Sequence, residues 1–314
     1  MVRYPVTPQQ LLALIAAHDK DEGRKKTWPV RSAAALKKAL ANPSAEITGL
    51  WSEIKPVYAT LQAGKCGFCE RLIGEDEKIA NEQDVEHFRP KKGVDAWPPG
   101  KHIGAEPLPV DMPVSSQSGK GYLRLAFHEL NYVMSCKTCN ARFKANFFPI
   151  RGKHSFAAAQ PGPLLQKEDP FLVHPLDGAD ADPEEVIGFD GFVAVPAAPM
   201  TQRKRWERGY VSVGFFGLND TSRQDQLLLA RARRLMFLGD RLRDYEAAPK
   251  TKKPAAWQEV QREFNLRQDH AGCVRAAIRL YSAGSRQRVL ADIEKARVFY
   301  GSKMGVPSDA PPPP

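Results

Sequence analysis

The stretch CKTCNARFK, residues 136–144, decides how this chain can be interpreted. Its two cysteines, Cys136 and Cys139, stand two residues apart, and the same spacing occurs at Cys66 and Cys69 in CGFC. Two such CxxC pairs supply four thiolates, which is the set that closes a tetrahedral zinc shell. A closed shell of thiolates leaves no position for water. The sequence therefore predicts a structural zinc ion.

Two other interpretations of the cysteine pairs stay open: a redox CxxC motif, and simple buried thiols. Neither pair lies between a strand and a helix of a thioredoxin-like pattern, which argues against redox chemistry. The fifth cysteine, Cys273, lies in the apolar run GCVRAAIRL and is predicted to be a core residue.

The composition is that of an ordinary soluble globular chain of 314 residues, with 42% hydrophobic residues and a formal net charge of +10. This length allows one large domain or two modest ones. The basic balance favours a polyanionic partner, with nucleic acid as the default, although a merely solubilising surface explains it equally well.

The only candidate signal or membrane segment near the start of the chain is LLALIAA, residues 11–17, which is too short to cross a bilayer. Thr7 and Pro8 instead predict a helix start, with Thr7 as the N-cap. We therefore expect a cytoplasmic protein without membrane contact. In a reducing compartment, paired cysteines indicate metal or redox chemistry more often than disulfides.

Between the cysteine pairs lies DVEHFRP, residues 84–90, a strand-like run in which Glu86 directly precedes His87. A metal-dependent nuclease needs oxygen ligands that hold a divalent ion and a neutral imidazole that deprotonates water. Glu86 and His87 supply one of each, and Asn140 could supply a second oxygen ligand. Asp84 shares a strand face with Glu86 and could reach the ion, although a structural role is favoured.

Each of these residues also has an ordinary interpretation. His87 could be a core histidine, Asn140 a helix cap and Asn131 a turn residue. A second strand-like run, LRLAFHELNYVM at residues 123–134, leads into the second cysteine pair, and residues 91–121 are predicted to form a long loop.

Taken together, CGFCE, DVEHFRPK and ELNYVMSCKTCNARFKANFFP resemble the HNH endonucleases, which are built on a ββα-metal core. The resemblance covers residues 64–150. It is closest to a zinc-containing branch that includes the nuclease subunits of Septu-type and retron-linked phage defence systems. Farther along, His174 stands where that branch usually has Asn.

The resemblance implies a role for each matching residue. His87 matches the general base, Glu86 and Asn140 match ligands of a catalytic divalent ion, and Asn131 matches the asparagine that orders the loop between the strands. Lys144 is a candidate phosphate contact, with a solvated surface charge as its alternative. Oxygen ligands favour Mg2+ or Mn2+ at this second site.

The predicted fold class is α+β: a mainly helical chain around a small zinc-bound ββα-metal core. The predicted segments are an N-terminal helical region at 1–63, the nuclease core at 64–150, an irregular segment with short strands at 151–200, a C-terminal helical region at 201–302 and a disordered Pro-rich tail at 303–314.

Four local features refine the helical regions. Pro56 is expected to split a helix predicted over residues 44–62. A capping box at 222–225 is expected to open an apolar helix, and Ser285 and Gly301 are expected to bracket the last one. Basic clusters at residues 203–205 and at Arg231, Arg233 and Arg234 could follow a phosphate backbone, or could form solvated helix faces.

The predicted function is a DNA endonuclease of a prokaryotic antiviral defence module, with an ATPase partner subunit implied by the resemblance. Two alternatives remain: a zinc-stabilised nucleic-acid-binding or adaptor protein whose nuclease site is inactive, and an HNH nuclease that acts on RNA. Intact Glu86, His87, Asn131 and Asn140 argue against the inactive site.

Overall fold

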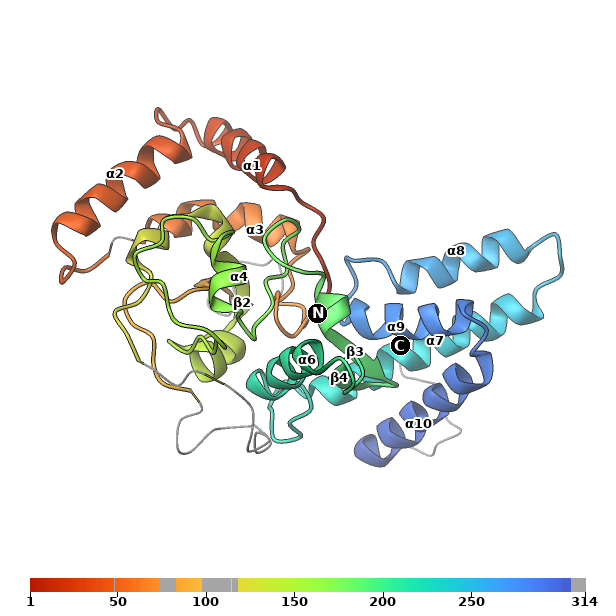
Figure 1. Ribbon diagram of the computed structural model, residues 1–314. Coiled ribbons are helices and arrows are strands. Elements are labelled where there is room, and N and C mark those ends of the chain that lie inside the picture. Colours follow the sequence, from red (N-terminus) through yellow and green to blue (C-terminus); the bar gives the residue numbers. More distant parts are fainter. Residues whose placement is uncertain (48, 74–82, 98–113, 115–117, 306–314) are drawn as a thin grey trace. The chain divides into compact units, whose positions relative to one another are not determined.

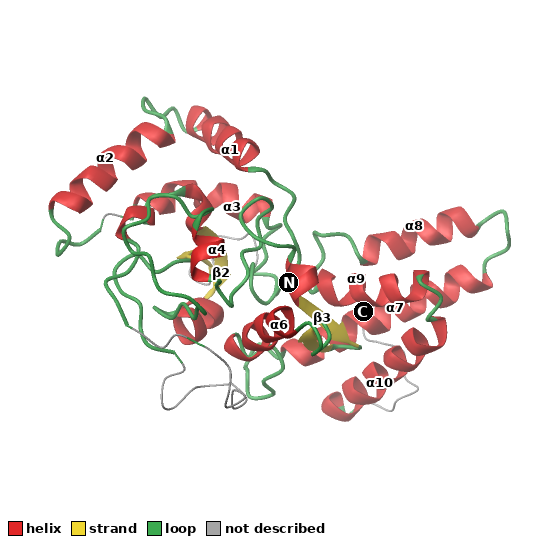
Figure 2. Cartoon of the chain, in the orientation of Figure 1, coloured by secondary structure: helices red, strands yellow, loops and turns green. Residues whose placement is uncertain are grey.

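The computed structural model describes residues 1–47, 49–73, 83–97, 114 and 118–305 (Figure 1). The chain divides into two compact units, one formed by residues 3–68 and 72–183 and the other by residues 1–2, 69–71 and 184 onward. Helices dominate the chain and the strands are few and short (Figure 2). The predicted mainly helical α+β class is therefore confirmed.

The unit of residues 3–68 and 72–183 contains two long N-terminal helices, two paired strands and several short helical turns. In chain order the elements are α1 (Pro8–Asp21), α2 (Trp28–Ala41), η1 (Leu50–Ile54), α3 (Lys55–Leu61), β1 (Gln83–His87), η3 (Leu123–Leu125), η4 (Glu129–Asn131), β2 (Tyr132–Cys136), η5 (Thr138–Lys144) and α4 (Leu164–Glu168).

The N-terminal helices begin and end for reasons that the sequence contains. Thr7 caps α1 through a reciprocal capping box with Gln10, and Pro8 occupies the first turn, so this prediction is confirmed. The predicted break at Pro56 is also confirmed, because η1 ends at Ile54 and α3 starts afresh at Lys55 with Pro56 in its first turn.

Strands β1 and β2 pair antiparallel, with Glu86 opposite Val133 and His87 opposite Tyr132. The strand predicted at DVEHFRP is therefore confirmed over its first part. The second strand-like run is wrong over residues 123–131, which form the turns η3 and η4. Its alternating apolar residues are buried by these turns, and only from Tyr132 onward does a strand form.

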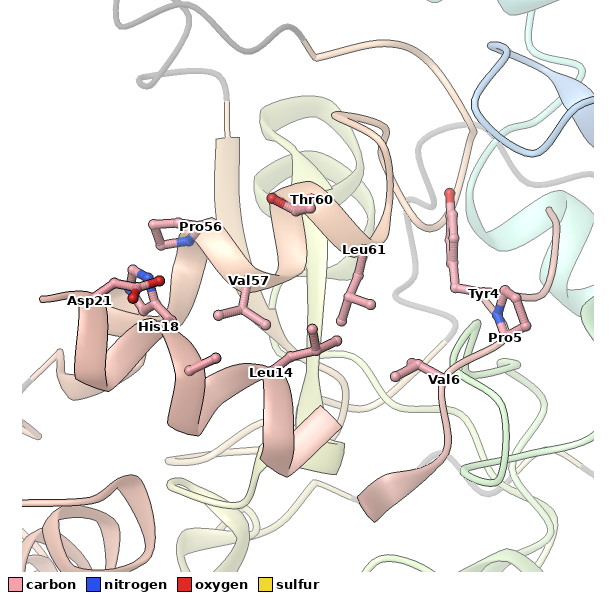
Figure 3. A pocket seen from close by; sticks show the side chains of 11 residues that line it. Tyr4, Pro5, Val6, Leu14, His18, Asp21, Pro56, Val57, Thr60 and Leu61 are labelled. Atoms are coloured by element: carbon pink, nitrogen blue, oxygen red, sulfur yellow. The ribbon is translucent and has the colours of Figure 1, made fainter. Parts of the chain in front are cut away.

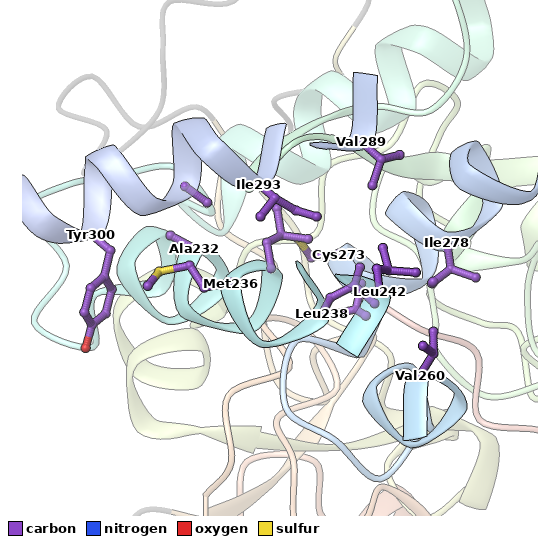
Figure 4. Close-up of a cluster of buried hydrophobic side chains, with 13 residues drawn as sticks. Ala232, Met236, Leu238, Leu242, Val260, Cys273, Ile278, Val289, Ile293 and Tyr300 are labelled. Carbon is purple, nitrogen blue, oxygen red and sulfur yellow. The ribbon is translucent and has the colours of Figure 1, made fainter. Parts of the chain in front are cut away.

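From Pro183 onward the elements are α5 (Pro183–Val186), β3 (Ile187–Asp190), β4 (Val193–Pro196), α6 (Arg203–Phe215), α7 (Leu227–Ala247), α8 (Lys253–Glu263), α9 (Ala271–Ser282) and α10 (Arg286–Met304). Helix α7 packs against α8, α9 and α10 around one apolar cluster (Figure 4). Cys273 is fully buried in this cluster, so its predicted core role is confirmed.

Two predicted helix boundaries in this part are wrong. Residues 222–225 do not cap α7. The Arg223 guanidinium donates to both carboxylate oxygens of Asp225, at 2.6 and 2.8 Å. The helix begins only after Gln226, whose φ is 47°. Helix α10 continues through the buried Gly301 to Met304 and ends at Gly305, whose φ of 67° suits glycine.

The start of the predicted tail at residue 303 is also wrong, because residues 303 and 304 are still helical. Residues 306–314, on which the rest of that prediction falls, lie outside the described part of the chain, as does much of the predicted loop at 91–121. None of the described helices is both long and apolar enough to cross a bilayer.

Candidate active site and metal centre

The four paired cysteines come together as the spacing predicted. The Sγ atoms of Cys66, Cys69, Cys136 and Cys139 lie within 4.8 Å of one another, and all four residues are buried. Four thiolates at a Zn–S distance of 2.3 Å would lie about 3.8 Å apart, so the donor set and its spacing fit a tetrahedral metal ion. Cys136 ends β2 and Cys139 lies in η5, so this cluster lies where η5 meets the end of the strand.

A polar cleft of about 400 Å³ lies next to the end of β1. It is formed by four stretches of the chain: η1 with the start of α3, strand β1, Lys91 beyond that strand, and η5 with the residues that follow it. The lining residues are Trp51, Ser52, Lys55, Asp84, Val85, Glu86, His87, Lys91, Asn140, Ala145 and Asn146. The structure therefore brings Glu86, His87 and Asn140 to one cavity, whereas Asn131 and Lys144 do not line it.

The His87 imidazole has a defined tautomer. Its Nε2 lies 3.0 Å from the carbonyl oxygen of Ala126, which can only accept a hydrogen bond, so Nε2 carries the proton. Nδ1 is then the nitrogen with the lone pair, and it faces the Lys91 ammonium at 3.5 Å. Burial, assisted by the charge of Lys91, lowers the pKa of His87 well below its usual range. The ring is therefore neutral at pH 7, as a general base must be.

Oxygen donors gather on one face of β1. Asp84 and Glu86 are two residues apart in the strand and so share a face. The amide nitrogen of Asn140 donates to Asp84 at 3.0 Å, and Lys137 lies 3.0 Å from the same carboxylate oxygen. With its nitrogen engaged, the amide oxygen is the atom of Asn140 that can ligate a cation. Carboxylate and amide oxygens suit Mg2+ or Mn2+.

Glu86 is paired on its buried side with Lys144. The Lys144 ammonium is fully buried and lies 3.5 Å from the Glu86 carboxylate. Burial raises the pKa of Glu86, and the charges of Lys144 and Lys91 partly offset this effect. Burial likewise lowers the pKa of Lys144, against the pull of Glu86. Neither a phosphate contact nor a solvated surface charge fits this position of Lys144.

Asn131 lies behind the cleft and holds the chain that leaves β1. Its side chain accepts from the amide of Arg89 at 2.8 Å and donates to the carbonyl oxygens of Arg89 and Leu125 at 3.0 and 3.1 Å. Its own carbonyl accepts from the amide of Phe88 at 2.8 Å. These contacts are the ones expected of a residue that orders the loop beyond His87.

The sequence prediction missed Trp51, Lys55, Lys91 and Asn146 as cleft residues. Trp51 falls within the helix predicted over residues 44–62, and helical periodicity indicates burial without saying which distant residues a side chain contacts. Lys91 did carry a signal, because it closes the EHFRPK run that contains Glu86 and His87.

The proposed phosphate-tracking role of the basic cluster on α7 is wrong for two of its three residues. Arg231 is buried and donates from Nε to the carbonyl oxygen of Leu227 at 3.1 Å. Arg234 lies 3.1 Å from Glu263. Arg231 also donates to the carbonyl oxygen of Leu218, and Arg234 joins α7 to the end of α8, so the two guanidinium groups form neither a nucleic-acid surface nor a solvated face.

A second cavity, of about 480 Å³, lies between α1 and α3 (Figure 3). Its lining is mainly apolar and includes Leu14, Val57 and Leu61, with His18 and Asp21 at one end. This chemistry differs from that of the carboxylate-rich cleft, and none of the predicted site residues lines it.

The fold and the site define a mainly helical α+β protein with a buried four-cysteine cluster and a polar cleft beside a short β-ribbon. Over 136 residues the chain is 31% identical to the Septu protein PtuB of Bacillus mycoides (strain KBAB4) and is distantly related to it. The matched region is 43% of this chain and 38% of PtuB, so the chain spans well under half of that protein's length. No family model and no solved structure matches the chain.

Proposed function

We propose that this protein is a metal-dependent HNH endonuclease that hydrolyses phosphodiester bonds in DNA. The observation that carries the proposal is the convergence of Glu86, His87 and Asn140 on one polar cleft, with the lone pair of His87 Nδ1 directed into it. A neutral imidazole next to oxygen ligands is the arrangement that metal-assisted phosphodiester hydrolysis requires.

Glu86 and Asn140 would hold the catalytic Mg2+ or Mn2+, with Asp84 as a third oxygen donor on the same strand face. A divalent ion bound there would polarise the scissile phosphate and neutralise the charge that develops on its oxygens. Lys144 would keep the Glu86 carboxylate ionised and fixed in one direction, because it is the nearest positive charge on the buried side.

His87 would accept a proton at Nδ1 from the attacking water. The water oxygen forms the new bond to phosphorus as the bond between phosphorus and the 3′ oxygen breaks. The Ala126 carbonyl supports this step because it keeps the other proton on Nε2 and fixes the plane of the ring. Trp51 and Tyr132 pack edge-on against the imidazole at centroid distances of 4.6 and 5.1 Å, which limits its rotation.

The four-cysteine cluster would bind a structural Zn2+ ion. The donor chemistry, the burial and the mutual distances of the sulfur atoms support this assignment. By fixing η5 against the end of β2, the ion would hold Asn140 opposite β1. The zinc site would thus contribute to hydrolysis only by holding Asn140 in position.

The relation to PtuB supports a role in antiviral defence, and the Septu-type resemblance adds an ATPase subunit as the proposed partner. In such a module this chain would be the effector that damages nucleic acid. Its net charge of +10 favours contact with a polyanion.

The activity is tested by incubating the purified protein with supercoiled plasmid and, separately, with RNA, in Mg2+, in Mn2+ and in EDTA. We expect nicked or linear plasmid in either metal and none in EDTA. Cleavage of RNA but not of plasmid would mean that the substrate is RNA and not DNA. Absence of cleavage of both, also after addition of the partner ATPase, would favour the adaptor with an inactive site.

A further inference from the structure

Lys91 occupies a position in the cleft that the proposed mechanism does not use. It follows His87 by four residues, directly after Pro90, and its ammonium lies 3.5 Å from Nδ1 of His87. The same ammonium lies over the ring of Trp51, 4.5 Å from the ring centroid. Trp51 comes from η1, a segment that is distant in sequence, so two separate parts of the chain place this one charge.

The contacts of Lys91 favour a role in binding an anion over a role in stabilising the fold through an ion pair. Among the described residues it forms no ion pair, and its close contacts are a neutral imidazole nitrogen and an aromatic face. Neither carries a full negative charge, whereas a phosphate oxygen does and would attract the ammonium more strongly. A phosphate oxygen that enters the cleft would therefore compete well for this ammonium.

We propose that Lys91 is the phosphate-binding residue of the cleft and that Trp51 positions it. In the structure Lys91 also covers the lone pair of Nδ1, the atom that must take the proton from water. When a phosphate draws the ammonium away, Nδ1 becomes accessible, so substrate binding and exposure of the base are coupled. The inference rests on the proposed function through His87.

The ligand class that follows is a phosphodiester strand, DNA or RNA. A single ammonium contacts phosphate oxygens and reads neither base nor sugar, so Lys91 supplies affinity without sequence preference. Each phosphate neutralised by the protein releases counterions, and the logarithm of the binding constant then falls with the logarithm of salt concentration by about 0.7 to 0.9 per contact.

The test is the binding of a fluorescently labelled oligonucleotide to the zinc-loaded protein, measured by anisotropy without Mg2+ or Mn2+ over a series of salt concentrations. Omission of the catalytic metal prevents hydrolysis, so the result does not depend on catalysis, and the proposed structural zinc is retained. Lys91→Met is compared with Lys92→Met, which removes the same charge from the exposed neighbouring residue, outside the cleft. We expect Lys91→Met to weaken binding several-fold and to reduce the salt slope by nearly one, with a smaller change in Lys92→Met. An unchanged affinity and slope in Lys91→Met would overturn the proposal.

The role of Trp51 is tested by a double-mutant cycle with Trp51→Leu and Lys91→Met. If Trp51 acts only by holding Lys91, the double variant binds no more weakly than Lys91→Met alone. Additive losses would mean that Trp51 contacts the nucleic acid itself and would remove its positioning role. Thermal unfolding of each variant verifies that the fold is retained.

Failure of this inference and failure of the proposed function give different results. A wild-type protein that cleaves plasmid while Lys91→Met binds normally would refute only the phosphate role. A wild-type protein that binds through Lys91 but never cleaves would refute only the nuclease.

Discussion

Asn131 forms hydrogen bonds with the chain next to the cleft but does not line the cleft itself. It is fully buried, and its amide bridges Arg89 and Leu125 on two separate turns. The chain between His87 and Lys91 is thereby held in one conformation. The hydrogen bonds act on the backbone of Arg89, which lies between the two cleft residues His87 and Lys91.

Asn131→Ala should destabilise the protein by about 2–4 kcal/mol, because it removes the hydrogen-bond partners of the buried N–H and carbonyl groups of Arg89. Urea unfolding measures the change. The exposed Asn42→Ala serves as the comparison and should change the free energy of unfolding by less than about 0.5 kcal/mol. Equal effects in the two variants would contradict the role given to Asn131.

His174 should make the protein sensitive to acid. Burial, assisted by the charge of Arg89, lowers the pKa of His174 from 6.5 to about 3. As the pH falls below 6.5, His174 becomes protonated in the unfolded chain but stays neutral in the folded protein. Stability is therefore lost from about pH 6.5 down to about pH 3. Between pH 7 and pH 5 this one group should cost about 2 kcal/mol.

The measurement is urea unfolding at pH 7 and pH 5 for the wild type and for His174→Asn. Asn cannot be protonated in this range, and its side-chain oxygen can accept the bond that Leu176 donates to His174 Nδ1 at 3.3 Å. We expect the pH dependence to become smaller by about 2 kcal/mol in the variant. The same pH dependence in both proteins would show that another group is responsible.

At the residue scale the sequence predicted the parts of the site that a short motif contains. Glu86 and His87 are neighbours, and Asn140 follows a cysteine whose partners fix its place. Trp51 and the burial of Lys144 could not be predicted in this way. Each depends on which distant segment packs against it, and local spacing contains no such information.

Among the elements, η5 has the most unusual geometry. The amide of Ala145 bonds the carbonyl of Asn140 at 2.6 Å, five residues back, which makes this turn a π-helix, and Ala145 ends it with a φ of 38°. The wide turn buries Phe143 and Lys144 while Asn140 lines the cleft. Such turns are frequently found at functional sites.

Cys139→Ser should release the proposed zinc and loosen η5. We expect one fewer equivalent of zinc per chain by elemental analysis, and a melting temperature lower by several degrees. Cys273→Ala is the matched control, because that thiol is buried in the helical core and does not belong to the four-cysteine cluster. Full zinc content in Cys139→Ser would contradict the four-thiolate assignment.

The elements differ in how well local patterns predicted them. Helix α1 and strand β1 follow local signals, a capping box and a run of strand formers. The turns at 123–131 and the start of α7 do not. There, the side chains of Asn131 and Arg223 form hydrogen bonds with nearby groups and fix turns that the apolar pattern alone does not reveal.

For the whole molecule, the composition predicted the class of protein better than it predicted where the charged side chains lie. The net charge of +10 suggests a polyanionic partner, yet buried arginines such as Arg223, Arg231 and Arg234 serve the internal structure. Among the described residues the buried basic and acidic side chains balance, six of each, so the net charge stays on the surface but does not tell which arginines face solvent. The segment boundaries proposed for the nuclease core and the helical regions remain predictions.

The central claim is that His87 is the base of a metal-dependent nuclease, and plasmid cleavage by His87→Ala tests it most directly. The matched control is His18→Ala, which removes a histidine that lines the other cavity. In Mg2+ or Mn2+, we predict that wild type and His18→Ala convert supercoiled plasmid while His87→Ala loses at least about 100-fold in rate. Cleavage by His87→Ala at the wild-type rate would contradict the account.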